Sequence, residues 1–227
     1  MEQLLRSTGP YAILDIDSLE ARGLDVAPAA QAMLGGGASL LQLRAKGRSA
    51  RKILAWLEAL VPLAKEAGVP LFVNDRADLA AVAGAPGVHV GQDDLPVTEV
   101  RRLFPELRVG VSTHSLAQLE AALAERPDYV AFGPIFPTRS KAQPDPVVGL
   151  ELLARAATLA TAAGVPLVAI GGIDSRNAHQ VRATGAVPAV IAALLPELAA
   201  DTPEPALAVI YARTRALCAG GDGSSPA

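Results

Sequence analysis

The feature that most constrains the fold is a short apolar run that recurs eight times and ends each time in polar or glycine residues. The runs are mostly continuous rather than alternating, which is typical of parallel strands covered on both faces. Helical patterns separate them, most clearly at 49–67, 116–125, 150–163 and 175–184, and Ser49 and Ser175 are expected as N-caps. The runs lie at 11–14, 39–43, 71–73, 87–90, 108–111, 129–132, 167–170 and 189–192.

Eight strand–helix units in about 210 residues predict a compact α/β fold, a (β/α)8 TIM barrel forming a single domain over residues 1–218. The pentapeptide Ala-Gly-Val-Pro-Leu occurs at both 67–71 and 163–167, which indicates a helix, a glycine cap and then a buried strand. An open doubly wound sheet is the rival, but it usually has fewer strands, and no glycine-rich dinucleotide motif follows 11–14. Residues 219–227 have no apolar content to bury, so we expect a disordered tail there.

Composition narrows the class of protein. Hydrophobic residues make up 51% and charged residues 19%, which excludes an intrinsically disordered chain. The net charge of −3 does not favour nucleic acid or an anionic membrane as partner. Cys218 is the single cysteine and cannot form an internal disulfide, and the first residues have no signal-peptide pattern. The uncharged stretch 156–173 is broken by Gly164 and Pro166, so we expect a helix, a turn and a strand in a cytoplasmic protein.

Polar side chains gather where the second expected strand ends. Gln42, Arg44 and Lys46 share one face of an extended segment, and the leucines between them share the other. If the leucines face the helices, an amide and two cations point into the mouth of the barrel. Two cations at this spacing repel each other, which suggests an anion such as phosphate between them. A solvated loop end is the plainer interpretation.

Two carboxylates follow the next two strands. Asp75 comes after 71–73 and Asp94 after 87–90, so both are expected at the same end of adjacent strands. Mg²⁺ is commonly held by one or two carboxylates together with substrate phosphates, so the pair predicts a magnesium site. Alternatively, Asp75 is a helix N-cap or pairs with Arg76, and Asp94 is the N-cap of a helix around 97–103.

The ends of the later strands indicate a second anion site, with fewer charged side chains than the first. A loop after 129–132 carries Thr138, Ser140 and Lys141, which can hold a phosphate and cover the site. The pair Gly171-Gly172 permits close backbone approach, and barrels of this kind often bind phosphate after strands seven and eight. After 108–111, His114 is either an acid–base residue or the start of the next helix. Together these features suit a diphosphate and a monophosphate bound side by side.

Taken in order, these segments resemble the thiamine phosphate synthase family. The resemblance spans about residues 11–215, and its motifs are specific only as a set. They are Gln-Leu-Arg-Ala-Lys at 42–46, Asn-Asp-Arg at 74–76, the segment 87–96, Gly-Val-Ser-Thr-His at 110–114, the segment 133–141 and Ile-Gly-Gly-Ile at 170–173.

The resemblance implies a Mg²⁺-dependent enzyme that joins hydroxymethylpyrimidine diphosphate to a thiazole phosphate, with pyrophosphate leaving first. By this resemblance, Asp75 and Asp94 hold Mg²⁺, and the residues acting on the leaving diphosphate are Arg44, Lys46, Ser112 and Lys141. The pyrimidine diphosphate further contacts Gln42, Leu43, Ala45 and Asn74. The thiazole phosphate is received by Thr138, Ser140, Gly172, Ala192 and Ala193. The family also suggests a homodimer.

Two departures from the family pattern are visible, and they leave other functions open. Ser140 stands where the family often has threonine, which keeps the hydroxyl. Ala192-Ala193 stands where it often has a serine, and Val187-Pro188 replaces a small or acidic turn. One alternative is the related thiazole tautomerase, which would use His114. Another is a phosphometabolite-binding barrel without turnover, although the carboxylates and Lys141 that such a barrel could lose are present.

Overall fold

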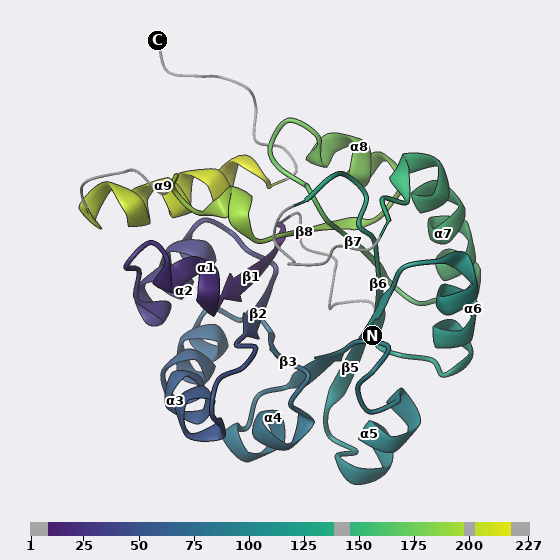
Figure 1. The fold of residues 1–227 in the computed structure, drawn as a ribbon, viewed down its shortest axis with the longest axis horizontal. Helices are drawn as coiled ribbons and strands as arrows, with labels where there is room; N and C mark the ends of the chain where they lie inside the picture. Colours follow the sequence, from purple (N-terminus) through teal and green to yellow (C-terminus); the bar gives the residue numbers. More distant parts are fainter. Residues whose placement is uncertain (1–8, 139–145, 198–202, 219–227) are drawn as a thin grey trace.

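The computed structural model describes residues 9–138, 146–197 and 203–218, and within them eight parallel strands close into a barrel. The strands follow chain order, and the first pairs with the last to complete the circle (Figure 1). The predicted (β/α)8 barrel is therefore confirmed, and the open doubly wound sheet is excluded. The strands are β1 (Tyr11–Asp15), β2 (Leu40–Arg44), β3 (Leu71–Asn74), β4 (Gly87–Val90), β5 (Arg108–Thr113), β6 (Tyr129–Phe132), β7 (Leu167–Ile170) and β8 (Val187–Val190).

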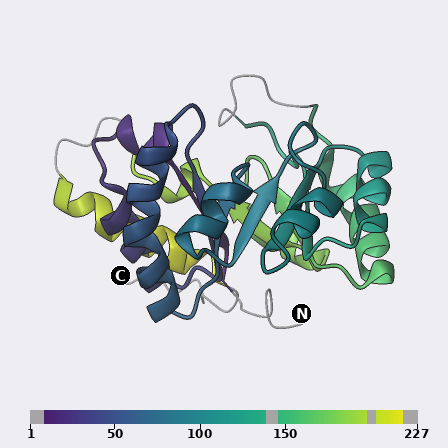
Figure 2. The same cartoon turned by 90° about the horizontal axis from the view of Figure 1, so that it is seen from below.

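Helices cover the outside of the barrel, and a perpendicular view shows strands lying between helices on either side (Figure 2). Ser49 caps the longest helix by accepting from the Lys52 amide, as its position before the periodic pattern predicts. The last helix, 203–216, packs against the helix 26–35. The helices are α1 (Ile16–Glu20), α2 (Val26–Gly35), α3 (Ala50–Glu66), α4 (Ala77–Ala83), α5 (Val97–Leu103), α6 (Leu116–Ala124), α7 (Gly149–Ala163), α8 (Ala178–Ala183) and α9 (Pro203–Ala216), with a 3-10 turn η1 (Ala192–Leu194).

The uncharged stretch 156–173 divides as expected. Helix α7 ends at Ala163, Gly164 adopts the left-handed conformation that stops it, and β7 begins three residues later. Within the described residues, no helix is long and apolar enough to cross a membrane.

The apolar core has an outer and an inner part. The outer part lies between the strands and the helices, and the inner part fills the barrel with residues that include Tyr11, Phe72 and Tyr129. Gly110 on β5 makes room for the inner part, because a Cβ there would lie 2.0 Å from the Tyr129 ring. The glycine is thus required by close packing inside the barrel.

Two expected boundaries are wrong. We expect the last strand at 189–192, but β8 begins at Val187 and includes Pro188, which pairs in register with Ala169. Proline normally interrupts a central strand, which is why Val187-Pro188 looks like a turn in the sequence. Ser175 is expected to cap the next helix, but α8 begins at Ala178, because Asp174 holds the Arg176 amide in a turn first.

Candidate active site

Two cavities adjoin each other at the carboxyl ends of the strands, which is the end where the sequence predicts the site. The first, here called the carboxylate cavity, has a volume of about 470 Å³ and contains Asp75 and Asp94. The second, the glycine cavity, has a volume of about 610 Å³ and contains Gly171 and Gly172. They share wall residues, so molecules bound in the two would meet. The shared residues are Ser112, His114, Ile170, Ala189 and Ile191.

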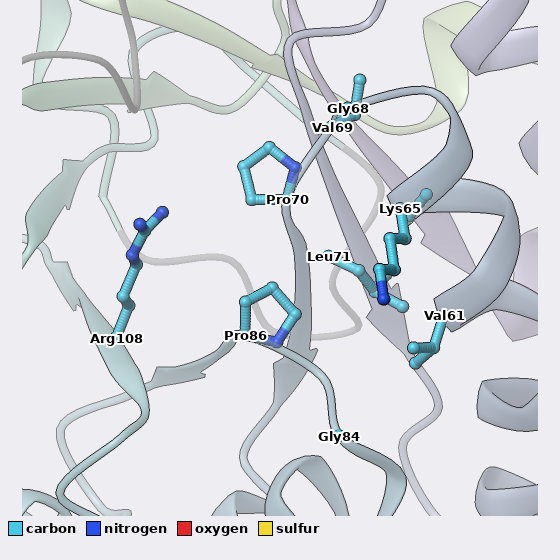
Figure 3. Close-up of a pocket in the computed structure, with 10 residues that line it drawn as sticks. Val61, Lys65, Gly68, Val69, Pro70, Leu71, Gly84, Pro86 and Arg108 are labelled. Carbon is cyan, nitrogen blue, oxygen red and sulfur yellow. The ribbon is translucent and has the colours of Figure 1, made fainter.

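A larger hollow of about 770 Å³ lies at the opposite end of the barrel, since its lining includes the first residues of β3 and β5. Figure 3 draws its lining residues. Pro70 and Pro86 form its middle, and Lys65 and Arg108 stand on either side. None of its lining residues is a carboxylate, a histidine or a hydroxyl, and this end of a barrel serves stability rather than chemistry. The functional assignment therefore belongs to the two adjoining cavities despite their smaller volumes.

Asp75 and Asp94 are brought together in the carboxylate cavity. Asp75 has a φ of +63°, a left-handed conformation that is uncommon outside glycine and that recurs at functional sites. Partial burial raises the pKa of the Asp75 carboxyl, and the negative charge of Asp94 raises it further. Lys46 lies 3.6 Å from Asp75 and partly offsets both effects. Two neighbouring carboxylates repel each other when both are ionised, so a cation bound between them would be stabilising.

The plainer roles weighed for these two carboxylates are not found. Helix α4 starts after Arg76, which pairs with Asp78 and not with Asp75. Helix α5 starts after Pro96, while the Asp94 carboxylate accepts a hydrogen bond of 2.7 Å from the Gly91 amide. Within the described residues no group of three or more His, Cys, Asp or Glu side chains could hold a metal ion. The pair fits Mg²⁺, which takes its remaining oxygens from water and substrate phosphates.

Arg44 and Lys46 both line the carboxylate cavity with Gln42, as the alternating pattern predicts. Arg44 is fixed by an ion pair with Asp15, a buried carboxylate at the end of β1. Register places the two residues opposite each other on neighbouring strands. Asp15 therefore orients the guanidinium, and only one of its nitrogens is engaged by this bond.

A chain of hydrogen bonds crosses the interior of the barrel below the carboxylate cavity. Gln42 donates to the Tyr11 hydroxyl at 2.6 Å, and the Tyr11 and Tyr129 hydroxyls are 2.8 Å apart. Tyr129 reaches Nδ1 of His89 at 2.7 Å, and Nε2 of His89 reaches Ser112 Oγ at 2.7 Å. Burial raises the pKa of both tyrosines, so both stay protonated and can donate.

The contacts are consistent with hydrogen bonds that all run in one direction along the chain. If Tyr11 accepts from Gln42 and donates to Tyr129, and Tyr129 donates to Nδ1 of His89, then Nε2 of His89 is the atom that donates to Ser112. The hydroxyl hydrogen of Ser112 is left to donate to an anion in the cavity.

Glycine and alanine backbone, a threonine and a histidine line part of the glycine cavity. Gly172 has a φ of +64°, and a Cβ there would lie 2.5 Å from the Pro137 carbonyl, so only glycine fits. Thr138 lines the same wall, and Ala192 and Ala193 begin η1. His114 lines both cavities, and its Nδ1 lies 2.7 Å from the Gly133 carbonyl.

Comparison with known proteins agrees with this geometry. Residues 11–194 match the family model described as thiamine monophosphate synthase. The chain belongs to the thiamine monophosphate synthase family. Among its relatives, a thiamine-phosphate synthase of Anaeromyxobacter dehalogenans is 48% identical over 184 residues, which cover 78% of this chain and 81% of that protein. The same enzyme of Roseiflexus castenholzii is 43% identical over 211 residues, covering 92% and 86%.

The solved structures lead to the same family. Thiamine phosphate pyrophosphorylase from Pyrococcus furiosus superposes with a TM-score of 0.77 at 29% identity, covering 94% of this chain and 95% of that one. A chain of Mycobacterium tuberculosis tryptophan synthase superposes at 0.64 with 15% identity, which reflects the shared barrel alone.

The structure gathers most of the site residues expected from the sequence, and it adds others. Asn74 lines the carboxylate cavity, while Leu43 is buried on the outer side of its strand. Ser140, Lys141 and the tail 219–227 lie outside the described residues. Asp15, Tyr11 and Tyr129 were not predicted as site residues, and the position of His89 within a strand indicates a structural role. A signal was available: each carries a polar atom on a strand that is otherwise apolar.

Proposed function

We propose that the protein transfers the hydroxymethylpyrimidine group from its diphosphate to a thiazole phosphate, giving thiamine phosphate and pyrophosphate. The bond between the pyrimidine methylene carbon and the diphosphate oxygen breaks first, and its electron pair leaves with pyrophosphate. The thiazole ring nitrogen then supplies the electron pair of the new carbon–nitrogen bond. No protein nucleophile is needed in this reaction.

One observation carries the proposal: a cavity lined by two cations and paired carboxylates shares wall residues with a second cavity lined by glycines, hydroxyls and two arginines. The diphosphate substrate belongs in the first and the thiazole phosphate in the second. With both bound, the reacting carbon and nitrogen meet at the shared wall, which supplies proximity.

Arg44 and Lys46 bind the diphosphate oxygens and favour the charge that develops on the leaving group. Ser112, held by His89, donates a hydrogen bond to the same group. Asp75 and Asp94 would hold Mg²⁺, which adds positive charge next to the leaving oxygens when bound. Lys141 is assigned to the diphosphate side as well, and Ser140 to the thiazole phosphate.

Gln42 and Asn74 face the pyrimidine diphosphate from β2 and β3, with the backbone of Leu43 and Ala45 beside them. Thr138, Gly172, Ala192 and Ala193 surround the thiazole phosphate, where backbone N–H groups replace a missing hydroxyl. A homodimer remains the expected assembly, and the cytoplasm the expected compartment.

The test is pyrophosphate release from the purified protein given both substrates, with Mg²⁺ and with EDTA. We expect release that requires Mg²⁺ and the thiazole phosphate, with thiamine phosphate formed in equal amount. Conversion of a thiazole carboxylate phosphate isomer without pyrophosphate release would instead identify a tautomerase acting through His114. Binding of both substrates without any turnover would identify a non-catalytic barrel.

A further inference from the structure

Arg22 lies in the turn after α1, half-buried on the wall of the glycine cavity. Its Nε donates to the Pro196 carbonyl at 2.7 Å, and its Nη1 donates to the Ser18 carbonyl at 2.8 Å. A guanidinium has five N–H donors, so three of them have no acceptor among the described residues. The Arg22 side chain is therefore held in place by two hydrogen bonds, and its other N–H groups are available to a ligand as far as the described residues are concerned.

Among the described residues that line the glycine cavity, Asp174 is the one carboxylate and it stands against two arginines, Arg22 and Arg176. Arg176 and Asp174 form an ion pair with each other and cancel. Arg22 has no carboxylate partner within the described part of the chain, so its charge is unmatched. A half-buried cation held by neutral carbonyls is a ready site for an anion, because binding one offsets its desolvation.

The neighbouring η1 segment supplies no polar side chain at its start, where Ala192 and Ala193 stand. Its contribution to an anion is limited to backbone N–H groups. Arg22 reaches this region directly, because the carbonyl it binds, that of Pro196, follows η1 by two residues. The Arg22 side chain thus links α1 to the segment after β8 by hydrogen bonds.

We propose that Arg22 is a binding residue for the phosphate monoester of the second substrate, and that it sets the preference for the phosphorylated thiazole over the free alcohol. The inference rests on the proposed function for the identity of that substrate, while the unmatched charge of the cavity stands independently of it.

The test compares Arg22→Gln, Arg22→Lys and a control, Arg48→Gln. Arg48 also contacts α1, through Asp17 and Glu20, but lines neither cavity. For Arg22→Gln we expect the KM for thiazole phosphate to rise about tenfold or more, with the KM for the pyrimidine diphosphate within about twofold. The thiazole alcohol should react as it does with the unaltered protein, Arg22→Lys should recover part of the loss, and Arg48→Gln should change neither KM.

Calorimetric titration with inorganic phosphate on the same proteins separates this inference from the proposed function. If the unaltered protein makes no thiamine phosphate but Arg22→Gln weakens phosphate binding, the proposed function fails and the role of Arg22 stands. If the protein turns over and Arg22→Gln leaves the KM for thiazole phosphate unchanged, the inference is overturned. An equal rise in both KM values, or an equal loss with the thiazole alcohol, also overturns it, because it marks a structural role.

Discussion

Replacing Tyr129 with phenylalanine probes the hydrogen-bond chain inside the barrel. The change removes one oxygen and leaves the ring in place against Gly110. Two hydrogen bonds are lost, one to Tyr11 at 2.8 Å and one to Nδ1 of His89 at 2.7 Å. Tyr11 keeps its contact with Gln42, and Nε2 of His89 keeps its contact with Ser112, but Nδ1 of His89 loses its contact with the Tyr129 hydroxyl.

The expected loss of folding free energy in Tyr129→Phe depends on which buried polar groups lose a hydrogen-bond partner. A neutral hydrogen bond contributes about 1 kcal/mol net, and a buried polar group left without a partner costs about 1–3 kcal/mol. With His89 losing a partner and Tyr11 retaining one, we expect about 2–3 kcal/mol in total. For a chain of this length that lowers Tm by about 4–12 °C.

Thermal unfolding followed by circular dichroism measures this shift, with Tyr211→Phe as the matched control. Tyr211 is 48% exposed, and its hydroxyl has no hydrogen-bond partner among the described residues, so its loss should change stability by less than about 0.5 kcal/mol. We expect Tyr129→Phe also to lower kcat, because the Ser112 hydroxyl loses its orientation. A Tyr11→Phe and Tyr129→Phe double-mutant cycle measures the coupling between the two hydroxyls.

If Tyr129→Phe unfolds within about 1 °C of the unaltered protein and keeps its kcat, the hydrogen-bond chain supports neither the fold nor Ser112, since both losses follow from the same broken contact. A loss of stability with kcat intact would limit the chain to a structural role and separate Ser112 from it.

Three further predictions follow from single contacts. Asp75→Asn should lower Mg²⁺-dependent turnover about a hundredfold, yet raise Tm in EDTA at neutral pH. The raised pKa of Asp75 means that its carboxyl group favours folding while it is protonated and loses that advantage as pH rises through the raised pKa. The increase in Tm from Asp75→Asn should therefore vanish in acid. An unchanged rate would contradict the metal assignment. Gly110→Ala should displace the Tyr129 ring and lower Tm by several degrees, whereas Gly68→Ala, which meets no atoms within 4 Å, tests left-handed strain alone. Arg44→Ala should raise the KM for the pyrimidine diphosphate more than that for the thiazole phosphate, and equal rises would contradict the two-cavity division.

Much of the site could be predicted from the order of strands. Parallel strands end at the same edge, so Gln42, Arg44, Asp75 and Asp94 had to meet if the eight apolar runs formed a barrel. The strand boundaries failed at Pro188, where a local rule about proline was overridden by pairing with β7. The helix starting at Ala178 was misplaced because Asp174 competes with Ser175 for the nearby backbone.

Local patterns in the sequence determined the barrel, its strand order and the gathering of charge at one mouth, because periodicity and glycine caps act over a few residues. Only the tertiary structure decided which polar groups are partners. Asp15 meets Arg44, and Tyr129 meets both Tyr11 and His89, across separations of 29, 118 and 40 residues. Such pairings depend on register and on which side chains face inward once the barrel closes, and neither can be identified from a pattern of a few neighbouring residues.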